Sequence, residues 1–206
     1  MRQFVHPDRL LKTGSETTLG VEHSDGTVSR ESQSSPGSAS SWEAELRKLL
    51  EDRRTPLHLV GVGNPLRGDD AVGLEIVSQL ATKIGNNPVK DVIVHAPSAA
   101  PESLLSKIDC VNERILIFDA VELGGEPGQV TLANLGNSKF GYFATHNVPL
   151  RVIPGLAANP SNVYVSGIEP EKLDVNEGLS AKVRASVDVI ASVVESALGG
   201  GSDGPS

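Results

Sequence analysis

Cysteine is almost absent from this chain, and the features of membrane-spanning and secreted proteins are missing. Cys110 is the only cysteine among 206 residues, which excludes a disulfide framework and a cysteine-rich metal site. No apolar run approaches the ~20 residues that cross a bilayer. The first residues lack the apolar core of a secretory signal. We therefore expect a cytoplasmic protein with no membrane partner.

Positive charge is also scarce. Eighteen Lys and Arg residues stand against 26 Asp and Glu residues, for a formal net charge of -8. This is the wrong sign for a surface that must neutralise many phosphates, because affinity for nucleic acid depends on basic side chains. We expect no nucleic-acid partner.

The apolar residues are concentrated after Leu57, and this uneven distribution predicts the domain organisation. Residues 1–41 form a polar leader that cannot bury enough surface to offset its ordering entropy, so we expect it to be disordered. Residues 42–54 carry a short apolar stripe that predicts a helix. One folded domain is expected over residues 55–199, followed by a disordered tail over residues 200–206.

Within that domain, segments typical of buried strands alternate with segments of helical periodicity. This alternation predicts one three-layer α/β domain, with a twisted, mostly parallel sheet and helices on both faces. The expected strands are Leu57–Val62, Val92–His95, Ile115–Phe118, Gln129–Leu132 and Val163–Ile168. The expected helices begin near Val72, Pro101 and Ser180.

Three side chains are candidates for chemistry because they follow predicted strands or open a predicted helix. Asp70 follows the first strand, Asp119 follows the strand Ile115–Phe118, and His146 lies at the start of another helix. Functional residues of open α/β sheets gather beyond the carboxyl ends of the strands. Two carboxylates and one imidazole are a plausible ligand set for nickel, zinc or a related ion.

Structural roles explain the same residues about as well. Asp69 and Asp70 could complement the positive end of a helix dipole, and Asp119 could be a turn residue that holds backbone amides. A single histidine near a helix start is more often structural than a ligand. Spacing alone leaves both interpretations open.

Nucleotide binding and serine hydrolase chemistry are disfavoured. The turn that begins at Gly61 has Leu66 where the third glycine of the dinucleotide fingerprint belongs, and the second strand ends at His95 rather than at an acidic residue. No Walker loop and no Gly-x-Ser-x-Gly elbow occur.

Several ordered motifs resemble those of hydrogenase maturation proteases. Gly61–Gly73 reads Gly-Val-Gly-Asn-Pro-Leu-Arg-Gly-Asp-Asp-Ala-Val-Gly, and Phe118–Val121 reads Phe-Asp-Ala-Val. The likeness continues through Glu126–Val130, Thr145–Leu150 and Val165–Pro170. These last three blocks are most similar to the branch that serves hydrogenase-3-type and coenzyme F420-reducing hydrogenases.

The resemblance implies a peptidyl-tRNA hydrolase-like fold with about five strands. It also implies an endopeptidase, filed as aspartic-type, that removes the C-terminal extension of the large-subunit precursor of a nickel–iron (NiFe) hydrogenase after nickel insertion. By position in the motifs, Asp70, Asp119 and His146 are the catalytic residues and the nickel ligands. The nickel is expected to come with the precursor rather than to be permanently bound. Asn64 and Ser98 are predicted to contact the substrate, and the protein is expected to be a monomer.

The sequence departs from the family pattern near the second strand, and three different functions stay open. The loop His95–Glu102 loses a glycine and is one residue longer, which puts the precursor preference in doubt. A peptidyl-tRNA hydrolase shares the Gly-x-Gly-Asn-Pro opening but needs a histidine where this chain has Gly73, Leu74 and Glu75. The sequence also allows a non-catalytic hydrogenase assembly factor or a zinc peptidase with its own metal.

Overall fold

A computed structural model describes residues 41–85, 89–97, 101–137, 159–175 and 178–199. The helices are α1 (Ser41–Glu51), α2 (Val72–Ile84), α3 (Pro101–Leu105) and α5 (Ala181–Gly199), with 3-10 turns η1 (Gly68–Ala71) and η4 (Pro160–Asn162). The strands are β1 (Leu57–Gly61), β2 (Val92–Val94), β3 (Arg114–Ala120), β4 (Val130–Asn134) and β5 (Val163–Ile168). The leader 1–40 and the tail 200–206 lie outside the described residues.

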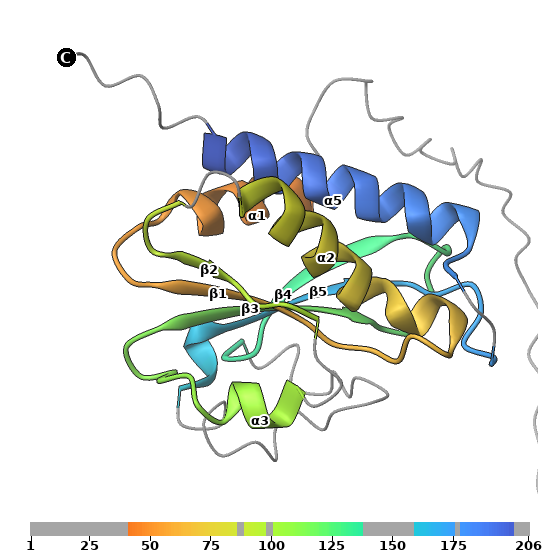
Figure 1. The fold of residues 1–206 in the computed structure, drawn as a ribbon, viewed down its shortest axis with the longest axis horizontal. Helices are drawn as coiled ribbons and strands as arrows, with labels where there is room; N and C mark the ends of the chain where they lie inside the picture. The colour runs from red at the N-terminus through yellow and green to blue at the C-terminus, as the bar shows by residue number, and fades with distance from the viewer. Residues whose placement is uncertain (1–40, 86–88, 98–100, 138–158, 176–177, 200–206) are drawn as a thin grey trace, which may run out of the picture. The chain divides into compact units, whose positions relative to one another are not determined.

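The strands form one sheet in the order β2-β1-β3-β5-β4, and only β4 runs antiparallel to its neighbour. The short connection between β3 and β4 contains no helix, which suits an antiparallel return because a parallel one needs a longer crossover. The predicted fold class, α/β with a mostly parallel sheet, is confirmed. The carboxyl ends of β1, β3 and β5 share one edge of the sheet (Figure 1).

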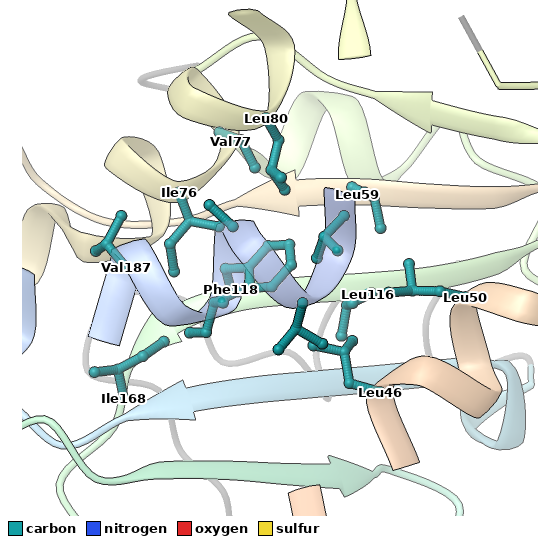
Figure 2. Close-up of a cluster of buried hydrophobic side chains, with 14 of the residues drawn as sticks. Leu46, Leu50, Leu59, Ile76, Val77, Leu80, Leu116, Phe118, Ile168 and Val187 are labelled. Carbon is teal, nitrogen blue, oxygen red and sulfur yellow. The ribbon is translucent and has the colours of Figure 1, made fainter. Parts of the chain in front are cut away.

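Helices α1, α2 and α5 cover one face of the sheet, and α3 lies on the other (Figure 1). On the first face, Phe118 of β3 is enclosed by apolar side chains from the three helices (Figure 2). The buried side chains around it include Leu46, Leu50, Leu59, Ile76, Leu80, Leu116 and Val187. A smaller cluster on the second face contains Val60, Leu105, Ile115, Ile117, Val163 and Val165. Both faces of the central strands are therefore buried, which explains their continuous apolar runs.

One buried guanidinium attaches α1 to the sheet. Arg114, the first residue of β3, donates hydrogen bonds to the carbonyls of Leu49 (3.1 Å), Thr55 (2.8 Å) and Asp52. The last carbonyls of a helix have no partner within the helix, so these contacts satisfy groups that burial would otherwise penalise. The helix expected over residues 42–54 runs from Ser41 to Glu51 and belongs to the folded unit.

None of the helices among the described residues is long and apolar enough to cross a membrane.

Candidate functional site

The turn between β1 and η1 is built by backbone contacts and one asparagine. Gly63 and Gly68 have φ angles of 149° and 53°, a conformation that side chains with a Cβ rarely adopt. The Asn64 amide donates to the carbonyl of Asp70 at 3.2 Å, and Asn64 Oδ1 accepts from the amide of Leu66 at 3.0 Å. These contacts hold η1, which carries Asp69 and Asp70, against the end of β1.

Gly73, in the first turn of α2, brings this segment close to β3. A Cβ on Gly73 would lie 2.1 Å from the carbonyl oxygen of Phe118 and 2.4 Å from that of Val62, so no larger residue fits without displacing backbone. Asp70 lies about one helical turn before this close approach. The last glycine of the Gly61–Gly73 motif therefore serves packing between α2 and the two central strands.

Asp119 lies near the end of β3 rather than after the strand, because β3 continues to Ala120 and pairs Asp119 with Gly167. Its side chain is 1% exposed, and its Oδ1 accepts from the amide of Ala120 at 2.9 Å. Ile117 and Val121 belong to the apolar cluster on the α3 face, and strand alternation places Asp119 on that face as well.

Asp70 and Asp119 therefore occupy the same corner of the sheet, at the carboxyl ends of the adjacent strands β1 and β3. The amide of Val62 donates to the carbonyl of Phe118 at 2.9 Å, which joins the start of the turn that leads to Asp70 to the residue before Asp119. Asp70, like Asp119, is 1% exposed.

Asp69 has a different environment from Asp70. Its Oδ2 accepts from the amides of Glu171 (2.8 Å) and Lys172 (3.0 Å), and its Oδ1 accepts from the amide of Ser180 (2.6 Å). Ser180 directly precedes α5. The partners of Asp69 are therefore the loop after β5 and the start of α5, not the amides of its own helix.

The other predicted site residues, His146 and Ser98, lie outside the described residues. Within the part of the chain that the structure describes, no group of three or more His, Cys, Asp and Glu side chains could hold a metal ion. The ligand and catalytic roles of Asp70, Asp119 and His146, and the substrate contacts of Asn64 and Ser98, stay predictions.

The structure joins two histidines that the sequence left apart. His58 Nδ1 lies 2.8 Å from His95 Nε2, the two rings stack at a centroid distance of 5.1 Å, and His58 Nε2 lies 3.2 Å from Glu113 Oε2. The carboxylate of Glu113 favours a proton on the facing His58 Nε2, and in that tautomer His58 Nδ1 accepts from His95 Nε2–H. The two ring nitrogens of His58 thus face different residues, Nδ1 facing His95 and Nε2 facing Glu113. His95 Nε2 therefore contacts His58 and not the aspartates.

Burial lowers the pKa of His58, although Glu113 opposes that shift, and burial with the neighbouring His58 lowers the pKa of His95. The folded state therefore disfavours protonation, and the unfolded state binds more protons below the ordinary histidine pKa of about 6.5. The stability contributed by the neutral pair is present above that pH and is lost as pH falls.

We expect the double variant His58→Gln/His95→Gln to lose less stability than the wild type between pH 7.5 and 5.5, measured as urea midpoints. Parallel losses in both proteins would contradict this assignment.

Glu169 is another residue whose role only the tertiary structure shows. It follows β5 and is 8% exposed. Its Oε2 accepts from the amide of Leu123 at 2.8 Å, and its Oε1 accepts from that of Gly124 at 3.3 Å. The only signal in the sequence is its place in the motif Val165–Pro170. Glu169 therefore fixes the loop that follows Asp119.

The five-stranded, mostly parallel sheet between helices is a fold that solved α/β peptidases share. The family profile described as hydrogenase maturation protease matches residues 74–197. The chain belongs to this family and is a peptidase.

Individual relatives agree with that membership. A Methanocaldococcus jannaschii protein named as a hydrogenase maturation protease is 30% identical over 149 residues, which cover 69% of this chain and 96% of that protein. The hydrogenase 3 maturation protease of Escherichia coli K12 is 27% identical over 146 residues, covering 69% and 91%. The crystal structure of the NiFe hydrogenase maturation protease HycI from Thermococcus kodakarensis KOD1 superposes with a TM-score of 0.60 at 26% identity, covering 73% and 99%.

Proposed function

We propose that this chain is the endopeptidase that removes the C-terminal extension from the large-subunit precursor of a NiFe hydrogenase after nickel insertion. The observation that carries the proposal is the pair of buried carboxylates, Asp70 and Asp119, at the carboxyl ends of β1 and β3. They belong to Gly61–Gly73 and Phe118–Val121, two of the motifs that resemble those of hydrogenase maturation proteases. The protein acts as a monomer in the cytoplasm. Its single cysteine, Cys110, is buried and forms no disulfide bond.

In this proposal the precursor brings the nickel ion, and Asp70, Asp119 and His146 bind it beside the scissile peptide bond. Carboxylate oxygens and an imidazole nitrogen suit such an ion. The burial of both carboxylates supports this role, because the attraction between a carboxylate and a cation is stronger in a site shielded from water. One carboxylate takes a proton from the water that attacks the scissile carbonyl and gives it to the departing amine as the C–N bond breaks.

Two further residues are proposed to contact the precursor. Asn64 Oδ1 is engaged by the amide of Leu66, so Asn64 Nδ2 is the group that would donate to a substrate carbonyl. Ser98, the other residue, follows β2 in the chain and lies outside the described residues.

The test is incubation of the purified protein with nickel-loaded precursor and with metal-free precursor, followed by mass spectrometry. We expect a released C-terminal peptide only from the nickel-loaded precursor. Cleavage of the metal-free precursor by a protein that carries stoichiometric metal of its own would instead indicate a self-contained zinc peptidase. Binding of the precursor with no change in its mass would indicate a non-catalytic assembly factor.

A further inference from the structure

Three large apolar side chains are exposed on the loops that leave the carboxyl ends of β1, β3 and β5. Leu66 is 62% exposed, Leu123 is 50% exposed and Val175 is 87% exposed. These loops emerge at the edge of the sheet that carries Asp70 and Asp119 (Figure 1). We propose that Leu66, Leu123 and Val175, here called the apolar rim, bind an apolar segment of the precursor next to the scissile bond. This inference rests on the proposed function.

The loops of the rim are packed against one another at their bases. Arg67 Nε donates to the carbonyl of Leu173 at 3.2 Å, and the amide of Asp69 donates to that of Lys172 at 3.0 Å. The amide of Val121 donates to the carbonyl of Ile168 at 2.9 Å. The loop after β5 therefore contacts both the turn that carries Leu66 and the start of the loop that carries Leu123.

The backbone beneath the rim is held in place by polar side chains. The amide of Leu66 is bound by Asn64 Oδ1 at 3.0 Å, and the amide of Leu123 by Glu169 Oε2 at 2.8 Å. The amide of Lys172, near Val175 in the chain, is bound by Asp69 Oδ2 at 3.0 Å. Apolar side chains on a backbone that is already ordered cost little entropy to bind, which is the property of a preorganised recognition surface.

The position of the rim identifies its occupant. Leu66 and Leu123 stand four residues before Asp70 and four residues after Asp119, respectively. The loops that carry both side chains leave the same end of the sheet as β1 and β3, so the occupant that we propose is the precursor on which the carboxylates act. Single exposed apolar side chains need no explanation, whereas three on loops that are joined at their bases can form one interaction surface.

Two exposed valines elsewhere provide a matched control. Val111 is 59% exposed before β3, at the opposite edge of the sheet, and Val189 is 45% exposed on α5. Replacing them by serine removes exposed apolar surface of the same kind without touching the rim.

The experiment compares the triple variant Leu66→Ser/Leu123→Ser/Val175→Ser with the control Val111→Ser/Val189→Ser. Nickel-loaded precursor is the probe for both KM and Kd. We expect the triple variant to raise KM and Kd by roughly tenfold or more, because binding would remove the Leu and Val side chains from water, and burying even one of them is enough for about a tenfold change in affinity. Its kcat should stay within about twofold and its thermal midpoint should not change. The control should match the wild type in every measurement.

The outcomes separate the rim from the proposed function. Cleavage with KM unchanged in the triple variant would overturn the rim and leave the function standing. Weaker binding by the triple variant, with no cleavage by the wild type, would support the rim and overturn the endopeptidase. A change in oligomeric mass with unchanged KM would assign the rim to self-association and overturn the inference.

Discussion

Replacing Asp70 by asparagine is expected to lower the rate of C-terminal peptide release by about 10²–10⁴-fold, the range seen when a group that transfers protons is lost. Asparagine keeps the shape of aspartate but loses the negative charge, so it neither accepts a proton nor binds nickel strongly. The assay is mass spectrometry of nickel-loaded precursor over time.

The same variant should fold almost normally. The geometry of η1 depends on backbone contacts of Asp70, whose amide donates to Arg67 at 3.1 Å and whose carbonyl accepts from Asn64 at 3.2 Å. Neither contact involves the replaced atom. We therefore expect a thermal midpoint close to that of the wild type, and processing at the wild-type rate would refute the catalytic role of Asp70.

Asp119→Asn provides an independent second case. The amide of Ala120 still finds an oxygen at this position, since Asp119 uses only Oδ1 for that contact at 2.9 Å. Activity should fall as it does for Asp70→Asn while β3 is retained. Asp188→Asn, at an exposed position of α5, is the control that should change nothing.

Replacing Asp69 by asparagine should have the opposite effect: it should lower the free energy of unfolding and leave the rate of peptide release largely unchanged. Both carboxylate oxygens of Asp69 accept backbone amides, at 2.6 Å from Ser180 and at 2.8 and 3.0 Å from Glu171 and Lys172. Asparagine has only one oxygen, so its NH₂ group must face at least one buried amide. Hydrogen bonds to charged groups contribute about 1.5–3 kcal/mol each, and an unsatisfied buried donor adds its own cost.

We therefore expect Asp69→Asn to lower the free energy of unfolding by about 3 kcal/mol, or roughly 6–12 °C in thermal midpoint. Peptide release measured well below that midpoint should fall far less than in Asp70→Asn. A thermal midpoint equal to that of the Asp188→Asn control would show that the three amide contacts of Asp69 contribute little. Loss of activity equal to that of Asp70→Asn at unchanged stability would move Asp69 into the catalytic site.

The two neighbouring aspartates show where inference from sequence stops. They are adjacent and identical in type, and both could have complemented a helix dipole. Their different environments come from partners far along the chain, since the amides bound by Asp69 lie 102 to 111 residues away. No local pattern contains that information, because contacts at such separation depend on how the strands are ordered.

The histidines illustrate the same limit. His58 and His95 are 37 residues apart, and the sequence offered no spacing that would pair them. They meet because β1 and β2 are parallel neighbours, with His58 opposite Ile93 and Leu59 opposite Val94. Likewise, the apolar run predicts a strand that ends at Phe118, because an aspartate follows it, whereas the hydrogen-bonded ladder of β3 continues to Ala120.

The sequence by itself determined the α/β class, the approximate bounds of every described strand and the family, because buried parallel strands are continuous apolar runs and the motifs are local. It also singled out Asp70 and Asp119. The tertiary structure decided that these two carboxylates share one corner while Asp69 and Glu169 support the loops around it. The physical reason is that the order of the strands determines which distant loops are in contact. Those contacts determine whether a buried carboxylate accepts hydrogen bonds from backbone amides.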